Sequence, residues 1–201
     1  MTLAKLAAQL KCASRFARRE RALPALWLVS DTQRLPNPRD AILRLPTGSG
    51  FIFRHYDHGD REAMARTLLR LCRKRRIVFL LAGDWRMALR VGADGAHFPE
   101  RLAHQARAMR AVKPDAMVTV AAHGLRGMRR AHQFGADAIM LSPLFATQSH
   151  PGAAPLGPVR FAKLTRAARA PVIALGGIGA ANACRLQGSG ATGIAGISAI
   201  V

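Results

Sequence analysis

Short apolar runs alternate with longer amphipathic stretches along most of the chain. Eight runs rich in β-branched and aliphatic residues end at glycine or at a polar residue. A continuous apolar run bounded by turn residues is typical of a strand buried on both faces. We therefore expect strands at residues 25–30, 50–54, 77–81, 92–98, 116–121, 138–142, 171–175 and 192–197.

The segments between these runs carry apolar residues at helical spacing. Strands that alternate with helices predict a parallel sheet, and eight such units predict an α/β fold of the (β/α)8 TIM-barrel type. An open doubly wound sheet is the alternative. The sequence ends at Val201, directly after the last expected strand, so no eighth C-terminal helix is expected.

The first residues form a basic segment of their own. Leu3, Leu6, Leu10, Ala13 and Ala17 recur at helical spacing, which predicts an amphipathic helix. We divide the chain into this N-terminal helix, residues 1–23, and a barrel, residues 24–201. Either the N-terminal helix or a partner subunit is expected to cover the place of the missing eighth helix.

Two strand ends are rich in glycine. The run at 171–175 stops at Gly176 and Gly177, and the run at 192–197 leads through Ile197 to Ser198. Glycine lets the backbone approach an anion closely, and in an eight-stranded barrel the loops after the last two strands commonly form a phosphate site. The alternative, that these glycines only end strands, stays open at this point.

The composition of the chain argues against a nucleic-acid-binding or membrane-spanning protein. The formal net charge is +20, but the basic residues are spread along the chain and only 5% of residues are aromatic, which argues against nucleic-acid binding. No apolar run is long enough to span a membrane. The three cysteines are far apart and lack metal-ligand spacing, so a cytoplasmic protein is expected.

Five stretches, taken together, resemble the thiamine phosphate synthase family, which includes the thiazole tautomerases called TenI. These stretches are LWLVSD at 26–31, VGADGAHF at 91–98, TVAAHGL at 119–125, GADAIMLSPLFATQSHPGAAPLG at 135–157, and PVIALGGI at 171–178 with GATGIAGISAI at 190–200. They follow the order and spacing of the family over nearly the whole chain from residue 25. The resemblance implies a barrel that binds a thiazole phosphate.

The resemblance is incomplete on the side that would bind a pyrimidine diphosphate. Family synthases couple that diphosphate to a thiazole phosphate with the help of Mg²⁺. The family residues for this step fall on Ile52, Arg54 and Tyr56, on Ala82 and Gly83, on Leu102 and on His150, so that only the arginine is kept. Asp84 lies one position late and is the residue that remains as a candidate metal ligand, which leaves Mg²⁺ in doubt.

The family residues that this sequence retains are the ones that would bind the thiazole phosphate. The resemblance implies phosphate binding by Gly176, Gly177, Ile197, Ser198 and Thr147, to which the loop adds Ser149 and His150 as candidate donors. It also implies proton transfer by His123, and histidine both takes and gives a proton near neutral pH. We therefore expect a TenI-like tautomerase. A functional synthase and a non-catalytic family member that binds a phosphate ligand are the alternatives, and the sequence leaves open a homo-oligomer.

For three of these residues a structural role is the alternative to the functional one. His123 either takes part in proton transfer or bonds its own loop. Arg54 either holds a ligand anion or neutralises Asp57 or Asp84. Asp84 is either a helix N-cap or a metal ligand.

Other polar residues are expected to serve the fold. Asp60 is predicted to cap the helix that follows it, and His97 to lie in the core or at its rim. Asp94 and Asp137 follow Gly-Ala in matching turns, where we expect them to bond turn backbone at the bottom of the barrel.

Overall fold

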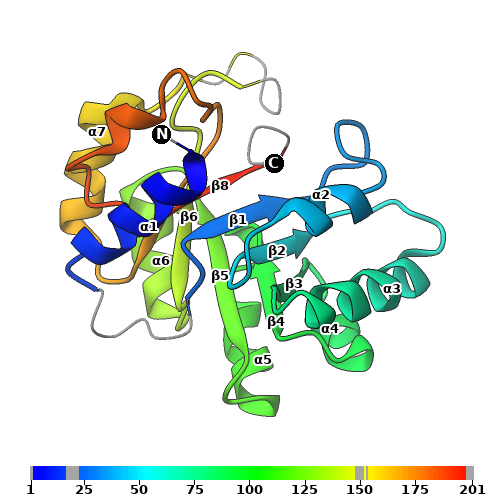
Figure 1. Cartoon of the computed structure of the whole chain (residues 1–201). Helices are drawn as coiled ribbons and strands as arrows, with labels where there is room; N and C mark the ends of the chain where they lie inside the picture. Colours follow the sequence, from blue (N-terminus) through cyan, green and yellow to red (C-terminus); the bar gives the residue numbers. More distant parts are fainter. Residues whose placement is uncertain (1, 17–22, 148–151, 153, 198–201) are drawn as a thin grey trace.

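The computed structural model describes residues 2–16, 23–147, 152 and 154–197. Eight parallel strands close into a barrel in chain order, with β8 beside β1 (Figure 1). The expected (β/α)8 barrel is therefore confirmed and the open sheet is excluded. The strands are β1 (Leu26–Val29), β2 (Gly50–Phe53), β3 (Val78–Ala82), β4 (Gly95–Phe98), β5 (Met117–Ala122), β6 (Ala138–Leu141), β7 (Val172–Leu175) and β8 (Gly193–Gly196).

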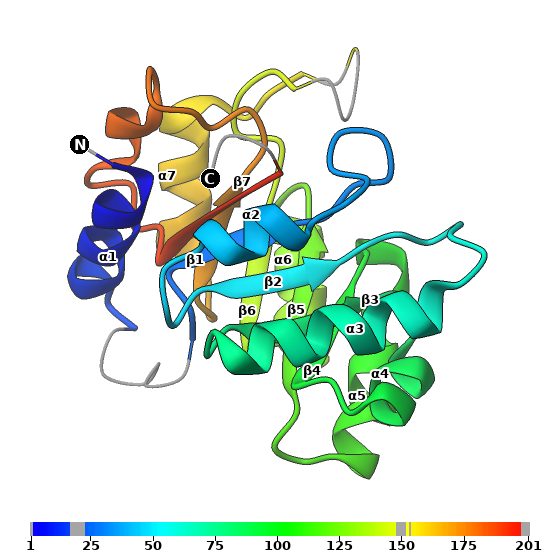
Figure 2. The same cartoon turned by 45° about the vertical axis from the view of Figure 1, so that its right-hand side comes forward.

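Helices lie around the outside of the strands (Figures 1 and 2). They are α1 (Leu3–Ala13), α2 (Arg39–Arg44), α3 (Arg61–Lys74), α4 (Trp85–Val91), α5 (Gln105–Val112), α6 (Leu125–Gln133) and α7 (Gly157–Ala167), with short 3-10 helices η1 (Glu100–Leu102) and η2 (Ala183–Leu186). The segment between β7 and β8, expected to be helical, contains only η2. Among the described residues no helix is both long and apolar enough to cross a membrane.

Buried side chains form two layers, one inside the barrel and one between the strands and the helices. Trp27, Ile52, Leu80 and Met140 belong to the inner cluster. Because side chains alternate along a strand, the neighbours of these residues point outward and pack under the helices. This alternation explains why strands with two buried faces read as continuous apolar runs.

Helix α1 covers the seam where β8 meets β1. Its buried face, which contains Leu6, Ala7 and Leu10, belongs to the outer core cluster, and the helix contacts β1, β8 and η2. The hydroxyl groups of Ser14 and Thr192 lie 3.2 Å apart, which joins the end of α1 to the residue before β8. The expectation that the N-terminal helix covers this part of the barrel is thereby confirmed.

Two aspartates bond backbone at the N-terminal end of the strands. A carboxylate oxygen of Asp94 accepts a hydrogen bond from the N–H of Phe79 at 2.8 Å. Asp137 accepts from the N–H of Val118 at 2.7 Å. Each carboxylate therefore joins the turn before its own strand to the preceding strand. The predicted location at the bottom of the barrel is confirmed, but the partner is strand backbone and not turn backbone.

The predicted cap at Asp60 was wrong. Its side chain makes no capping hydrogen bond, whereas Asp84 accepts from the N–H of Met87 at 2.9 Å. Asp60 has φ −111° and ψ 45°, outside the extended conformation that directs a capping side chain toward the first free N–H groups of a helix. Asp84, at φ −128° and ψ 97°, has that extended conformation.

Candidate functional site

A cavity of about 380 Å³ opens at the C-terminal ends of the strands. Its described lining comes from the ends of β1, β2, β6, β7 and β8. The lining residues are Val29, Arg34, Arg54, Ser142, Pro143, Ala146, Thr147, Leu175–Gly179, Asn182 and Ala195–Ile197. The structure therefore brings together Arg54, Thr147, Gly176, Gly177 and Ile197 from the sequence prediction. Ser149, His150 and Ser198 lie outside the described residues.

The two glycines after β7 have backbone conformations that suit glycine. Gly176 and Gly177 have φ of +99° and +65°. A side chain at Gly177 would collide with the carbonyl oxygen of Ala146, and one at Gly176 would press on Pro143. The β6–α7 loop thus packs directly on the β7 loop, so these glycines also have a structural role.

Three residues that line this part of the cavity have backbone donors without a partner among the described residues. The N–H groups of Gly177, Ile178 and Ile197 make no hydrogen bond to another described residue. Asn182 fixes the loop, because its amide donates to the carbonyl of Gly177 at 2.8 Å and its side-chain oxygen accepts from the N–H of Gly179 at 2.9 Å. Clustered, fixed N–H groups are the kind of donor that binds a phosphate oxygen.

His123 lies beside this cavity, just after β5. Its Nδ1 is 2.9 Å from the carbonyl oxygen of Ser142, a residue of the cavity lining. A carbonyl only accepts, so Nδ1 carries a proton, and in the neutral ring Nε2 is then the basic nitrogen. The exposed ring is thus held in one orientation, and its Nε2 atom is the base. The two interpretations of His123, a hydrogen bond to a loop and a role in proton transfer, are therefore compatible.

Glu100 fixes the loop that carries His123. Its carboxylate accepts from the N–H of His123 at 3.0 Å. The same carboxylate packs on Gly127 of α6, where a Cβ atom would collide with it. Glu100 is therefore engaged in holding the β5–α6 loop.

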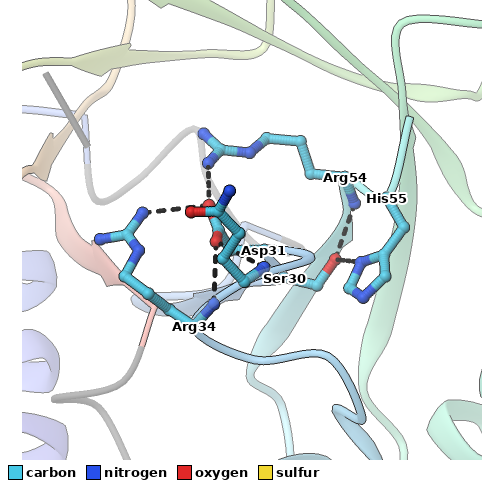
Figure 3. Close-up of polar contacts among 6 residues, drawn as sticks. Ser30, Asp31, Arg34, Arg54 and His55 are labelled. Atoms are coloured by element: carbon cyan, nitrogen blue, oxygen red, sulfur yellow. Dashed lines mark hydrogen bonds and ion pairs between the residues drawn. The ribbon is translucent and has the colours of Figure 1, made fainter. Parts of the chain in front are cut away.

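On the other side of the cavity, one carboxylate joins two arginines (Figure 3). Asp31 Oδ2 lies 3.1 Å from Arg34 Nη2 and 3.0 Å from Arg54 Nη2, and both arginines line the cavity. Partial burial by itself raises the pKa of Asp31, but hydrogen bonds from Arg34 outweigh this and hold the pKa well below its usual range. Asp31 is therefore ionised at neutral pH. Of the two interpretations left open for Arg54, neutralisation of Asp57 or Asp84 was wrong, because Arg54 pairs with Asp31, the carboxylate that follows β1.

A buried pair below Arg54 positions its backbone. The Ser30 hydroxyl accepts from the N–H of Arg54 at 2.8 Å and lies 2.9 Å from His55 Nδ1. His55 Nε2 lies 3.1 Å from the carbonyl oxygen of Pro36 and therefore donates to it, so Nδ1 accepts from Ser30. Burial lowers the pKa of His55, which keeps this arrangement neutral.

Comparison with known proteins decides the family. A model described as thiamine monophosphate synthase matches residues 40–200. The chain belongs to this family. The thiamine phosphate synthase resemblance seen in the sequence is therefore confirmed.

Named relatives agree with this assignment, and a solved structure shares the fold. The chain is 37% identical over 147 residues to putative thiamine-phosphate synthase 2 of Aquifex aeolicus, covering 72% of this chain and 78% of that protein. It is 33% identical over 186 residues to thiamine-phosphate synthase of Geobacillus kaustophilus, covering 88% and 84%. Thiamine phosphate pyrophosphorylase from Pyrococcus furiosus has the same fold, with a TM-score of 0.75 at 24% identity over 90% of this chain and 88% of that one.

The described residues of the cavity lining do not supply the carboxylate ligands expected of a Mg²⁺ site. Mg²⁺ prefers carboxylate oxygen ligands, and no carboxylate lies among the described residues of the cavity lining. Asp84 caps α4, and Glu100 holds the His123 loop. No group of three or more histidine, cysteine, aspartate or glutamate residues in the described part of the chain is arranged to hold a metal.

Where synthases of the family would place an Asn-Asp pair, this chain has a packed side-chain cluster. Arg61 donates to the carbonyl of Ala82 at 2.6 Å and lies over the rings of Phe53 and Tyr56. Tyr56 in turn packs on Gly83. The ends of β2 and β3 are therefore occupied by contacts within the chain.

Sequence reasoning missed Asp31 and Arg34. Asp31 directly follows the first apolar run, at the end of a strand where barrel active sites lie. This position after a strand could have identified Asp31 as a candidate site residue. Arg34, by contrast, is one arginine among many and lies in an irregular loop, so no pattern distinguished it.

Proposed function

We propose that this thiamine monophosphate synthase family member binds a thiazole phosphate in the cavity and shifts a proton on its ring. The observation that carries the proposal is the pairing of two features at one cavity. The N–H groups of Gly177, Ile178 and Ile197 supply donors for the phosphate, and His123, bonded to Ser142 of the lining, supplies the base.

The chemistry requires only these groups. Nε2 of His123 removes a proton from a ring carbon of the non-aromatic thiazole isomer, and the electron pair of that C–H bond enters the ring. The imidazolium then returns a proton to another atom of the same ligand, so the net result is an isomerisation to the aromatic thiazole. No metal and no leaving group take part.

A direct assay tests this proposal. The non-aromatic thiazole phosphate isomer is incubated with the protein, and aromatisation is followed by ultraviolet absorbance and by proton NMR. We expect turnover by the natural protein and a large loss in His123→Gln. Absence of turnover by the natural protein, despite binding, would instead support a non-catalytic family member.

Thiamine phosphate synthesis is the second candidate function. The relatives named thiamine-phosphate synthase favour it, as does Arg54, which lines the cavity. Incubation with pyrimidine diphosphate, thiazole phosphate and Mg²⁺ tests it. Formation of thiamine phosphate would overturn the preference for the tautomerase.

A further inference from the structure

We infer that a groove between α6 and α7 docks an acidic, amphipathic segment of a partner protein. The groove has a volume of about 520 Å³, and no described residue lines both it and the cavity at the C-terminal ends of the strands. It is lined by one face of α6, from Leu125 to Gln133, and by Ala167, Ala168 and Arg169 at the end of α7. We call it the α6–α7 groove. The inference goes beyond the proposed function and does not rest on it.

The first argument is the apolar floor of the groove. Leu125 and Met128 lie three residues apart and therefore on one face of α6. Ala167 and Ala168 supply only small side chains on the side of α7. The two helices also pack on each other less closely than α3 packs on α2 or on α4. A hollow of this kind accepts the apolar face of an amphipathic helix, and methionine adapts to such a partner.

The second argument is a pair of cations beside this floor. Arg129 and Arg169 line the groove, and both are exposed. Within the described part of the chain neither side chain makes a hydrogen bond or an ion pair. The carbonyl oxygens at the end of α7 have another donor, because Arg15 bonds those of Thr165 and Arg166 at 3.3 and 3.0 Å. Arg169 therefore remains available to a partner.

The third argument is the distribution of charge along the chain. Eight of the eleven acidic residues lie between residues 31 and 100, and none follows Asp137. Helix α6 carries three arginines, and α7 carries two arginines and a lysine, without an acidic residue in either helix. The carboxylates that form ion pairs among the described residues, Asp31, Glu62 and Asp137, lie outside both helices. The positive charge around the groove therefore complements an acidic partner.

The groove and its charge together favour a protein segment over other occupants. A second copy of this chain in a two-fold dimer would bring the same arginines against each other, and like charges repel. An anionic bilayer is flat and would leave a concave floor unfilled. A nucleic acid would leave the floor empty too, and no Phe, Tyr or Trp is among the described lining residues to stack on its bases. An acidic helix with an apolar stripe matches both the floor and the cations.

The experiment is fluorescence anisotropy at low and at physiological ionic strength. The probe is a labelled peptide of glutamate, alanine and leucine with leucines at i, i+3, i+4 and i+7, which form one helical stripe. One comparison peptide has glutamine in place of glutamate, and another has the same composition with the leucines spread around the helix. Thermal melts establish that each protein variant is folded.

Two pairs of variants separate the floor from the charge. Ala167→Trp fills the groove without changing its charge, and Ala111→Trp, at an exposed position of α5, is its control. Arg129→Glu reverses one charge at the groove, and Arg44→Glu makes the same change at an exposed position of α2.

We expect the natural chain and both controls to bind the probe peptide with equal affinity. Ala167→Trp and Arg129→Glu should each bind it about tenfold or more weakly, as is usual for residues at the centre of an interface. The loss in Arg129→Glu should shrink as salt is added, because salt screens exposed charges, whereas the loss in Ala167→Trp should persist. Both comparison peptides should bind more weakly than the probe.

No binding of the probe by the natural chain, or equal affinity in Ala167→Trp and Ala111→Trp, would overturn the inference. Three other outcomes would assign the face to a different occupant and would overturn it as well. These are binding of phosphatidylserine vesicles without peptide binding, binding of a single-stranded oligonucleotide without peptide binding, and a dimer in light scattering that Ala167→Trp dissociates. Failure of thiazole phosphate to bind would refute the proposed function alone, since the peptide titration does not involve that ligand.

Discussion

The Nδ1 of His123 lies 2.9 Å from the carbonyl oxygen of Ser142, so the residue after β5 is bonded to the residue after β6. Ser142 also lines the cavity. One hydrogen bond therefore sets both the tautomer of the imidazole and its position beside the ligand site. The carboxylate of Glu100 holds the backbone of the same histidine.

Replacing His123 should separate chemistry from binding. We expect His123→Gln to lower the rate of ring aromatisation about 10²- to 10⁴-fold, the usual contribution of a general acid–base group. The affinity for thiazole phosphate should stay within about twofold, since the proposed phosphate donors are backbone groups elsewhere. Rate and affinity are measured by absorbance and calorimetry. His132→Gln, on the exposed face of α6, is the control, and an equal loss of rate in it would contradict the assignment.

Gly177→Ala should abolish thiazole phosphate binding. The new methyl group collides with the Ala146 carbonyl oxygen, and φ of +65° is unfavourable for alanine. Gly48→Ala is the matched control, because Gly48 has φ +80° and open space around it. We expect Gly48→Ala to lower the free energy of unfolding by about 1 kcal/mol without affecting binding. Unchanged thiazole phosphate affinity in Gly177→Ala, by calorimetry, would show that the β7 loop is not the site.

Helix α1 should be essential for barrel stability. Leu6 is 1% exposed and belongs to the outer core cluster that α1 shares with the strands. We expect Leu6→Ala to lower the free energy of unfolding by about 2–5 kcal/mol, the usual cost of such a truncation in a core. Gln9→Ala, on the exposed face of the same helix, should change it by less than about 0.5 kcal/mol. Urea unfolding measures both, and equal effects would mean that α1 packs loosely.

Acid should destabilise the protein partly through His97. Burial, with a smaller effect of Arg54, lowers the pKa of this histidine to about 3, and its Nδ1 lies 2.9 Å from the Thr119 hydroxyl. The unfolded chain takes up this proton near pH ~6.5, but the folded protein does so only near pH 3. The stability is therefore fully present above pH ~6.5 and is lost as the pH falls from there toward 3, with a slope of about 1.4 kcal/mol per pH unit for one proton.

His97→Asn should flatten this dependence. Unfolding free energies of the natural chain and the variant are compared between pH 4 and 7, with His104→Gln, an exposed histidine, as the control. The lowered pKa of His55 acts in the same direction, so part of the slope should remain. An identical slope in His97→Asn and the natural chain would show that His97 titrates normally.

The strands were predictable because each is buried on both faces and therefore leaves a continuous apolar run in the sequence. Residues 138–142 and 171–175, for example, correspond to β6 and β7 within one residue. The spacing of Leu3, Leu6 and Leu10 predicted a helix. Its packing against β8 is a tertiary contact that this spacing does not specify.

The polar contacts of the site were less predictable, because they join residues far apart in the chain. Arg54 meets Asp31 across 23 residues, and nothing local distinguishes Asp31 from Asp57 or Asp84 as its partner. Asp60 and Asp84 both precede helices, and only the backbone conformation before each helix decides which one is a cap. Such outcomes depend on tertiary geometry that residue spacing does not encode.

We propose that backbone N–H groups at the C-terminal ends of β7 and β8 bind the phosphate of a thiazole phosphate. Titration of ¹⁵N-labelled protein with thiazole phosphate, followed by NMR, tests it most directly. We expect the amide signals of Gly177, Ile178 and Ile197 to shift downfield together and to saturate at one ligand per chain. Saturable shifts confined to another part of the molecule, such as the separate cavity lined by Met128 of α6 and Ala167 of α7, would contradict the proposal.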